Sequence, residues 1–442
     1  MRALFFLATV VFFVSCKPQP QNGVDSTGYG DTGIQTGYFT LNRPLVTDSG
    51  ALATVSDGGN ILFYNQPSGV YYKGKHSRTY MAWLDRRNIV QLSYYDDRYN
   101  RMTTYADIFA WPYKDDHAQP VLHVKQYGDL KGHIYIFSSL HNSRLVYTRS
   151  KKPESITDFT PLSIIDNGKC TYPSVLETPT GELMVFYTRN TYSSDTGYKH
   201  WTRNLYYITS TDGGNTWSKE KEIVTGGTGT WVYYVQPVYK DDGIHIAFSI
   251  MKDDGGVYDV HYIKSNDGGD TWIYNDSTIN ALPVLANNPI YITPEGTQTR
   301  AWDLKLNSVG EPVIAYQNYD STVGRSYVMY NIRTEPKHYF VTNSINSYYP
   351  AGLVLDEYNT NIAYASSVGK NGQNEIVEKT LDKQLDSFVT TSVISKETGR
   401  HQMRPQMVKQ YHNMKLLWVD ELEYNSFKDY KTNLKGYIDQ GK

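Results

Sequence analysis

The sequence predicts an all-β fold, and within that class a seven-bladed β-propeller. Short stretches of alternating apolar and polar residues follow one another through most of the chain, separated by turns rich in Gly, Asn and Asp. Two nearly identical turn motifs lie about one blade length apart, and amphipathic helical periods are scarce. Regular short strands with frequent turns indicate a barrel, a sandwich or a propeller, and the repeated motif selects the propeller.

The predicted strands run from about Asn42 to the C-terminus. They are rich in β-branched, aromatic and other apolar residues, which favour strands. Clear examples are residues 79–83, 133–137, 183–187 and 244–248.

The repeated turn motif, Ser-x-Asp-Gly-Gly-x-Thr-Trp, occurs at Ser210–Trp217 and at Ser265–Trp272. In this motif, the Asp-box, we expect the aspartate to cap the turn, the glycines to take positive φ and the tryptophan to pack beneath the blade. The spacing, on the order of 50 residues, suits one four-stranded blade and gives about seven blades in all. Weaker echoes at Thr171–Ser174 and Ser347–Gly352 are expected to open two further blades.

The first residues predict an export signal. Arg2 precedes an apolar stretch, Ala3–Val14, which is too short for a permanent membrane span. Ser15 and Cys16 follow directly, so we expect a lipoprotein-type signal peptide over residues 1–16 with Cys16 as the lipidated first residue of the mature chain. Phe13 departs from the preferred lipobox residue, and secretion without a lipid is the alternative.

Residues 17–37 are rich in Gly, Gln, Thr, Asp and Pro without an apolar period, which predicts a flexible tether. The remaining residues, 38–442, are expected to form one propeller domain. We therefore expect an exported, monomeric protein that is a lipoprotein of the cell envelope, at the outer membrane or cell surface, or is secreted.

The composition of the chain limits the classes of binding partner that we expect. A net charge of −2 gives no electrostatic case for nucleic acid, nor for a membrane beyond a lipid anchor. The 40 tyrosines suit stacking on sugar rings, although tyrosine also favours strands. Apart from Cys16 the chain has only Cys170, which predicts a buried thiol and no disulfide.

Several segments resemble the propeller family that contains ulvan lyases and related neuraminidase-repeat proteins. They are residues 115–120, 139–142, 147–150, 171–173, 186–189, 203–207, 403–405 and 424–430. The resemblance covers nearly the whole chain after the tether. It implies a polysaccharide lyase that cleaves a uronic-acid-containing polysaccharide, ulvan first, by β-elimination, which leaves an unsaturated uronyl end.

Such a lyase removes the C5 proton of a uronic acid and expels the sugar linked at C4. It needs a cation that neutralises the carboxylate, a base that faces C5 and an acid that reaches the leaving oxygen. Arg203 is the candidate neutraliser, because a guanidinium stays charged and grips a carboxylate with two hydrogen bonds. The alternative is that Arg203 pairs with an acid of its own blade.

Three residues are candidates for the base and the acid. The resemblance matches Tyr187 to a catalytic tyrosine, and we expect neighbouring strands to bring Tyr187 and Arg203 to one rim; the alternative is an ordinary strand aromatic. His117 and His141 follow successive strands of an earlier blade, and an imidazole suits proton transfer or polarisation of the carboxylate. Their alternative role is that of hydrogen-bonded structural histidines. Which group is base and which acid stays open.

Asn142, Arg189 and Tyr234 are predicted to bind substrate, with Tyr233 and Tyr239 as alternatives to Tyr234. The elimination requires no cofactor. A metal site is a competing use for His117 and His141, and the resemblance leaves a structural metal ion open, because related lyases can carry one. No H-E-x-x-H or C-x-x-C spacing identifies ligands here, and ligands gathered from separate blades would give no such spacing.

Three other functions share this scaffold. A glycoside hydrolase, such as an α-L-rhamnosidase, needs two carboxylates roughly 5–9.5 Å apart. A sialidase needs an N-terminal Arg-Ile-Pro type motif, and residues 61–67 contain no arginine. A non-catalytic surface propeller would bind glycan without turnover.

Overall fold

The computed structural model confirms an almost entirely β fold. It describes residues 47–48, 52–193, 200–240, 243–274, 277–279, 282–285, 292–293, 296–320, 325–332, 337–344, 352–395 and 399–439. The predicted signal peptide with Cys16, the tether and residues 347–351 lie outside these ranges. The described part contains strands β1–β33 and one short 3-10 helix, η1 (Asp116–Ala118), and none of its helices is long and apolar enough to span a membrane.

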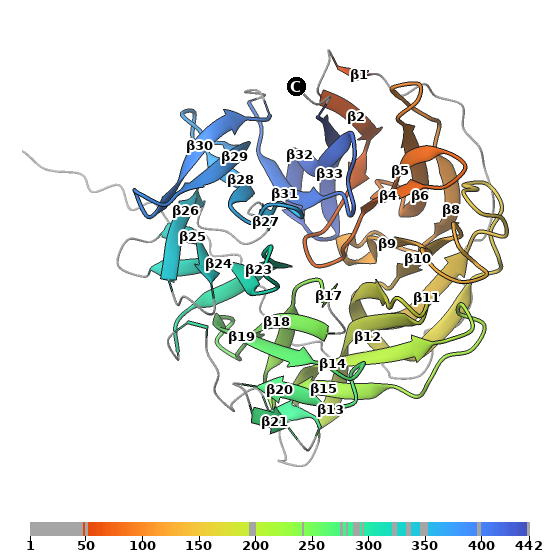
Figure 1. Ribbon diagram of the computed structural model, residues 1–442, viewed down its shortest axis with the longest axis horizontal. Coiled ribbons are helices and arrows are strands. Elements are labelled where there is room, and N and C mark those ends of the chain that lie inside the picture. Colours follow the sequence, from red (N-terminus) through yellow and green to blue (C-terminus); the bar gives the residue numbers. More distant parts are fainter. Residues whose placement is uncertain are drawn as a thin grey trace, which may run out of the picture.

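Figure 1 shows the strands as antiparallel groups arranged around a common centre. In chain order, the first group lies before η1 and the second group lies after it. The first comprises β3 (Gly59–Asn60), β4 (Gly69–Lys73), β5 (Ser77–Asp85), β6 (Ile89–Asp96), β7 (Arg101–Met102) and β8 (Ala106–Ala110). The second comprises β9 (Val121–Val124), β10 (Ile134–Ser138), β11 (Ser143–Arg149) and the first half of β12 (Ser163–Glu177).

The next two groups carry the two Asp-boxes. The first of them comprises the second half of β12, β13 (Leu183–Ser193), β14 (His200–Ser210) and β15 (Lys221–Thr225). The other comprises β16 (Trp231–Tyr234), β17 (Val238–Lys240), β18 (Gly243–Met251), β19 (Val257–Ser265), β20 (Trp272–Tyr274) and β21 (Ser277–Ile279), and β22 (Val284–Leu285) pairs with β15.

Three groups complete the circle. They are β23 (Thr299–Leu306), β24 (Pro312–Asp320), β25 (Arg325–Ile332) and β26 (Lys337–Ser344); then β27 (Leu353–Leu355), β28 (Ile362–Val368), β29 (Asn374–Asp382) and β30 (Ser387–Val393); and finally β31 (Gln402–Met407), β32 (Met414–Ser426) and β33 (Asp429–Ile438) with β2 (Leu52–Asp57) and β1 (Thr47–Asp48).

The inner strands close into a ring. Contacts run from β4 to β9, β12, β17, β23, β27 and β31 in turn. The ring closes where Tyr71 N of β4 donates to the carbonyl of Lys409, just after β31, at 2.9 Å. Strand β2 pairs with β33, so the two ends of the described chain share one sheet (Figure 1). Apolar side chains fill the space between successive sheets, and Trp83, Trp272 and Trp418 are fully buried there.

The Asp-box turns form as the sequence predicts. The Oδ1 of Asp212 accepts from Thr216 N, and that of Asp267 from Thr271 N, both at 2.9 Å. The glycines of both turns have positive φ, between 68° and 100°. Each turn is also tied to the preceding sheet, because Tyr135 Oη donates to the Gly213 carbonyl at 2.8 Å and Tyr207 Oη donates to the Gly269 carbonyl at 2.9 Å. The motif therefore stabilises packing between blades. Cys170, also as predicted, is a buried free thiol.

We expect Asp267→Ala to lower the free energy of unfolding by about 1–2 kcal/mol, because it leaves the Thr271 N–H and the hydroxyls of Ser265 and Thr271 without their acceptor. Chemical denaturation followed by tryptophan fluorescence measures this loss. Asp270→Ala is the matched control, since Asp270 lies in the same turn with a side chain 72% exposed, where an ion pair contributes little. Equal losses in the two variants would contradict the role given to Asp267.

Candidate active site

Two residues of the candidate site lie on β-bulges of inner strands. Tyr172 and Arg404 have left-handed backbone conformations, with φ of 56° and 57°, and each precedes a proline. The strand register shifts at both places. Bulky residues adopt positive φ rarely, and a bulge redirects a side chain relative to its strand. Both side chains contact a cluster of charged and aromatic groups built around His117 and His141.

His117 belongs to η1 and is held between two carboxylates. Its Nδ1 lies 2.7 Å from Asp115 Oδ1 and 3.2 Å from Asp116 Oδ1, and all three side chains are buried. Burial by itself lowers the pKa of His117, but the negative charges and hydrogen bonds of Asp115 and Asp116 outweigh it and raise the pKa to about 9. His117 is therefore an imidazolium at neutral pH.

His141, in the turn between β10 and β11, stacks on His117 with ring centroids 4.4 Å apart. Burial first, and then the positive charges of His117, Arg203 and Lys428, lower the pKa of His141 well below its ordinary value. Arg203 Nη2 lies 2.9 Å from His141 Nε2. A guanidinium can only donate, so Nε2 is the unprotonated nitrogen of a neutral imidazole.

Arg203, on β14, is a buried cation, only 3% exposed. Besides its bond to His141, its Nε donates to Asn190 Oδ1 at 3.0 Å, and its guanidinium lies 5.2 Å from the ring of Tyr172 and 5.5 Å from that of Tyr233. Among the described residues, Nη1 has no acceptor in hydrogen-bond geometry and no carboxylate forms an ion pair with Arg203. A buried charge without a counter-ion is costly, so the site is suited to receive an anion.

The hairpin of β32 and β33 covers the histidines. The ring of Phe427 meets the rings of His117 and His141 edge to face, at 5.2 and 5.9 Å. Tyr424 Oη donates to Asp116 Oδ2 at 2.7 Å, and Arg404 Nη2 lies 3.2 Å from the same oxygen. Although burial opposes it, these partners and His117 lower the pKa of Asp116, which stays a carboxylate.

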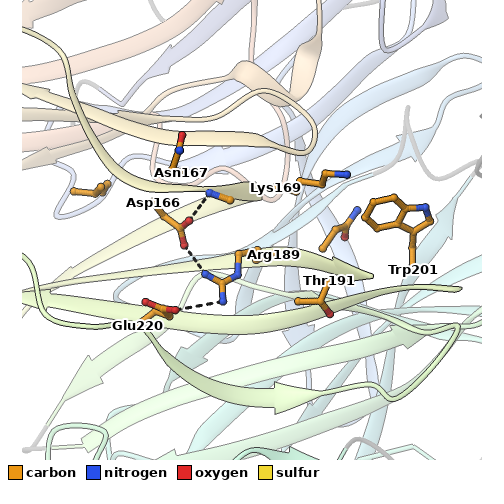
Figure 2. A pocket seen from close by; sticks show the side chains of 10 residues that line it. Asp166, Asn167, Lys169, Arg189, Thr191, Trp201 and Glu220 are labelled. Carbon is orange, nitrogen blue, oxygen red and sulfur yellow. Dashed lines mark hydrogen bonds and ion pairs between the residues drawn. The ribbon is translucent and has the colours of Figure 1, made fainter. Parts of the chain in front are cut away.

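A pocket of about 610 Å³ opens beside this cluster, at the ends of β12, β13 and β14. Figure 2 shows its side chains, among them the Lys169 and Trp201 pair and the Arg189 guanidinium held between Asp166 and Glu220. Asn190 lines the pocket and bonds Arg203, so the pocket adjoins the candidate site.

Residues 78–348 match the family described as "BNR repeat-containing family member". The chain belongs to this BNR-repeat family. Its fold is similar to that of a PL25 ulvan lyase bound to -[GlcA(1-4)Rha3S]-, with a TM-score of 0.67 and 13% identity over 87% of this chain and 94% of that one. The polysaccharide lyase Uly1 gives a TM-score of 0.55 and 14% identity over 85% and 91%. No curated protein sequence matches. These likenesses establish the neuraminidase-type propeller fold that ulvan lyases share.

In this BNR-repeat protein, Tyr187 does not lie beside Arg203. Strands β13 and β14 pair in unbroken register, with Asn190 opposite Arg203 and Tyr187 opposite Tyr206. Side chains alternate along a strand, so Tyr187 and Arg203 point to opposite faces, and the expected shared rim is wrong. Tyr187 Oη instead donates to Asp166 Oδ2 at 2.6 Å. Burial first, and then that carboxylate, raise the pKa of Tyr187, so its phenol stays protonated.

Arg189 shares this other face. Its Nη1 lies 3.0 Å from Asp166 Oδ2 and its Nη2 3.5 Å from Glu220 Oε1. The predicted substrate-binding arginine thus lines the pocket with its charge already paired.

Of the three alternative tyrosines, the structure brings Tyr233 to the cluster. Tyr234 is 1% exposed and its Oη donates to the Tyr172 carbonyl at 2.6 Å, so it supports the bulge from the core instead of facing the site. Tyr233 and Tyr239 both pack against the edge of the same core. Tyr233 is half-buried, with its ring 5.8 Å from that of Tyr172. Asn142 reaches the cluster indirectly, because its Oδ1 accepts from Asn190 Nδ2 at 2.6 Å.

Sequence reasoning assigned no role to Asn190, Tyr172, Arg404, Asp115 or Asp116. Four of these five stand in the family-like segments, and Tyr172-Pro173 and Arg404-Pro405 are the visible signal of the two bulges. Asn190 gives no such signal, since only the pairing register shows that it shares a face with Arg203.

The acidic group beside His117 is the natural place to look for a metal. The ligand atoms of Asp115, Asp116 and His117 all lie within 4.8 Å of one another. However, Asp116 already accepts from Arg404 and Tyr424, and the proton on His117 lies between the two carboxylates. A metal ligand histidine must be deprotonated, so these residues fit a proton better than a cation.

The His117 ion pair predicts a pH-dependent stability. Its folded pKa of about 9 lies above the ordinary 6.5, so its contribution is fully present below about pH 6.5 and is lost as pH rises through about 9. We expect the free energy of unfolding, measured by urea titration across this range, to fall with pH in the wild type. His117→Gln flattens this fall, and Asp115→Asn moves it to lower pH.

His412→Gln is the control, because His412 is an exposed histidine whose side chain is 57% accessible beside Asp97. It is expected to leave the pH dependence as in the wild type. An unchanged dependence in His117→Gln would show that His117 is not the titrating group.

Proposed function

We propose that this protein is a polysaccharide lyase that cleaves a uronic-acid-containing polysaccharide, ulvan first, by β-elimination. The observation that carries the proposal is Arg203, a buried guanidinium without a carboxylate partner among the described residues, bonded to a neutral imidazole. A uronate carboxylate is the anion that such a site would neutralise. The similar fold of an ulvan lyase bound to -[GlcA(1-4)Rha3S]- supports the same substrate class.

The first step would be neutralisation. The substrate carboxylate accepts hydrogen bonds from Nη1 and Nη2 of Arg203, which is the two-point grip of a guanidinium. Because Nη2 now donates to His141 Nε2, this exchange also releases the lone pair of that nitrogen. The neutralised carboxylate makes the C5 proton more acidic at the moment when a base becomes free.

His141 Nε2 would then accept the C5 proton, and the C–H electron pair forms the C4–C5 double bond while the C4–O bond breaks. The leaving oxygen takes a proton from the phenol of Tyr233, which is half-buried beside Arg203. His117 does not exchange protons in this scheme. Its positive charge helps to keep His141 neutral and able to accept a proton.

The hydrolase alternative is less well supported. Retaining and inverting hydrolases use a pair of carboxylates, one as acid and one as nucleophile or base. The carboxylates nearest the histidines, Asp115 and Asp116, are bound to His117, Arg404 and Tyr424 and are therefore not available.

The remaining features are proposals that agree with this function. The ring of inner strands, β4, β9, β12, β17, β23, β27 and β31, supports seven blades in one domain. Export on a lipidated Cys16, or secretion, would bring a monomeric enzyme to an extracellular polymer, and the elimination as written needs no cofactor.

Ultraviolet absorbance during incubation with ulvan and other uronate polymers tests the proposal, because elimination creates a conjugated unsaturated uronate. We expect absorbance to rise with wild type and kcat to fall by about 10²–10³-fold in Arg203→Ala. Arg203→Lys restores little, since an ammonium lacks the two-point geometry. Free rhamnose without absorbance would instead establish a hydrolase, and binding without either product a glycan-binding propeller.

Variants of Tyr233 and Tyr187 distinguish the proton donor that the geometry favours from the catalytic tyrosine that the resemblance implies. We expect Tyr233→Phe to lower kcat by about 10²-fold or more, as loss of a general acid does. Tyr187→Phe should lower it much less, because the Tyr187 hydroxyl bonds Asp166 on the other face of the sheet. Initial rates of both variants on one polymer decide between them, and the reverse order of effects would return the proton transfer to Tyr187.

A further inference from the structure

Arg300 is a buried arginine beside the candidate site to which the elimination described above gives no role. It lies on the inner strand β23 and is 6% exposed. Its Nε donates to the hydroxyl oxygen of Tyr64, and its guanidinium carbon lies 5.5 Å from the centre of the Tyr233 ring. The guanidinium carbon of Arg203 lies at the same distance from that ring. Tyr233, the proton donor of the scheme, thus has two buried cations close to it.

The charge of Arg300 acts on a cluster of three tyrosines. The rings of Tyr64, Tyr172 and Tyr233 lie close together, with centroids 5.0, 5.3 and 5.8 Å apart. Burial first, and then the neighbouring phenols, raise the pKa of Tyr172 well above its ordinary value, and the positive charges of Arg203 and Arg300 oppose this rise. Both arginines therefore favour negative charge on the phenols of this cluster.

The charge balance of the elimination gives this effect a use. When Tyr233 passes its proton to the leaving oxygen, the phenol becomes a phenolate, whose negative charge spreads over the ring. Arg203 is then bound to the substrate carboxylate, which already balances its charge. Arg300 is the other buried cation beside the ring, and the attraction between two groups shielded from water is screened less than it would be in solution.

We propose that Arg300, given the proposed lyase function, is a positioning residue that stabilises the Tyr233 phenolate as it forms, without touching the substrate. Its bond to Tyr64 and its contacts with the rings of Phe63 and Trp302, 4.8 and 5.3 Å away, hold the guanidinium in place. Loss of its charge slows the departure of a poor leaving group, such as a sugar alkoxide, which must be protonated as it leaves. A leaving group that departs as a stable anion needs no proton and should not depend on Arg300.

The test compares Arg300→Gln with the wild type on a uronate polymer and on a synthetic uronide that carries 2,4-dinitrophenol at C4. On the polymer we expect kcat to fall about tenfold with a much smaller change in KM, because the phenolate charge is partly developed in the transition state. On the dinitrophenyl uronide the two proteins should have similar kcat. Equal losses on both substrates, or no loss on either, would overturn the role of Arg300.

A double variant tests whether Arg300 acts through Tyr233. In a Tyr233→Phe background no phenolate forms, so adding Arg300→Gln should leave kcat on the polymer unchanged. A further tenfold fall in the double variant would contradict the proposal, because Arg300 would then act on another step.

Two single variants separate the charge of Arg300 from its part in packing. Arg300→Lys keeps a positive charge and should recover most of the polymer rate. Should Arg300→Gln fail to fold, Arg300→Lys takes its place, with a smaller loss confined to the polymer, because the shorter side chain sets its charge farther from the ring. Arg78→Gln is the matched control, since the mostly buried Arg78 guanidinium lies 3.9 Å from the Tyr94 ring centre, in the first blade. It should leave both rates as in the wild type.

The wild-type protein keeps this inference distinct from the lyase function. If it forms unsaturated product from neither substrate, the lyase function fails and the role of Arg300 fails with it. If it forms product from both and Arg300→Gln slows both equally, the lyase function stands and the role of Arg300 alone is overturned.

Discussion

The candidate site depends on one electrostatic constraint, which is that the Arg203 guanidinium is kept out of water with no carboxylate of the described residues to balance it. Asn190 and His141 hold the guanidinium through neutral acceptors, and two phenol rings flank it. A carboxylate in place of either acceptor would compensate the charge and would also repel an acidic substrate. The protein therefore bears a cost of several kcal/mol in desolvation, which an arriving anion can offset.

This constraint extends to the histidines, whose opposite protonation states form one coupled system. The carboxylates of Asp115 and Asp116 keep the proton on His117, and the resulting imidazolium, stacked 4.4 Å from His141, helps to keep His141 neutral. The two carboxylates thus affect His141 through the charge of His117. The closure of the ring supports the same system, because Arg404 and Tyr424 reach Asp116 from the last blade.

The sequence predicts more of the fold than of the candidate site. The Asp-box specifies a local turn, so residues close in sequence were enough to predict its hydrogen bonds at Asp212 and Asp267. His117, His141 and Arg203 were found because they stand in family-like segments. The sequence did not reveal the partner of Arg203 on β13. Choosing Asn190 and not Tyr187 requires knowledge of which residue of β13 lies opposite Arg203. A pairing register depends on long-range contacts, and one residue of error reverses the face.

Bulges limit sequence reasoning in a second way. At Tyr172 an extra residue shifts the alternation, so a count from the start of β12 assigns later side chains to the wrong face. The choice between Tyr233 and Tyr234 has a similar origin: the buried hydroxyl of Tyr234 bonds the carbonyl of the bulged residue, which leaves its neighbour to face Arg203. The tyrosine that supports the site and the tyrosine that faces it are thus adjacent in sequence. On β16, one face thus carries Tyr234, which supports the bulged backbone at Tyr172, and the other face carries Tyr233, which lies beside Arg203.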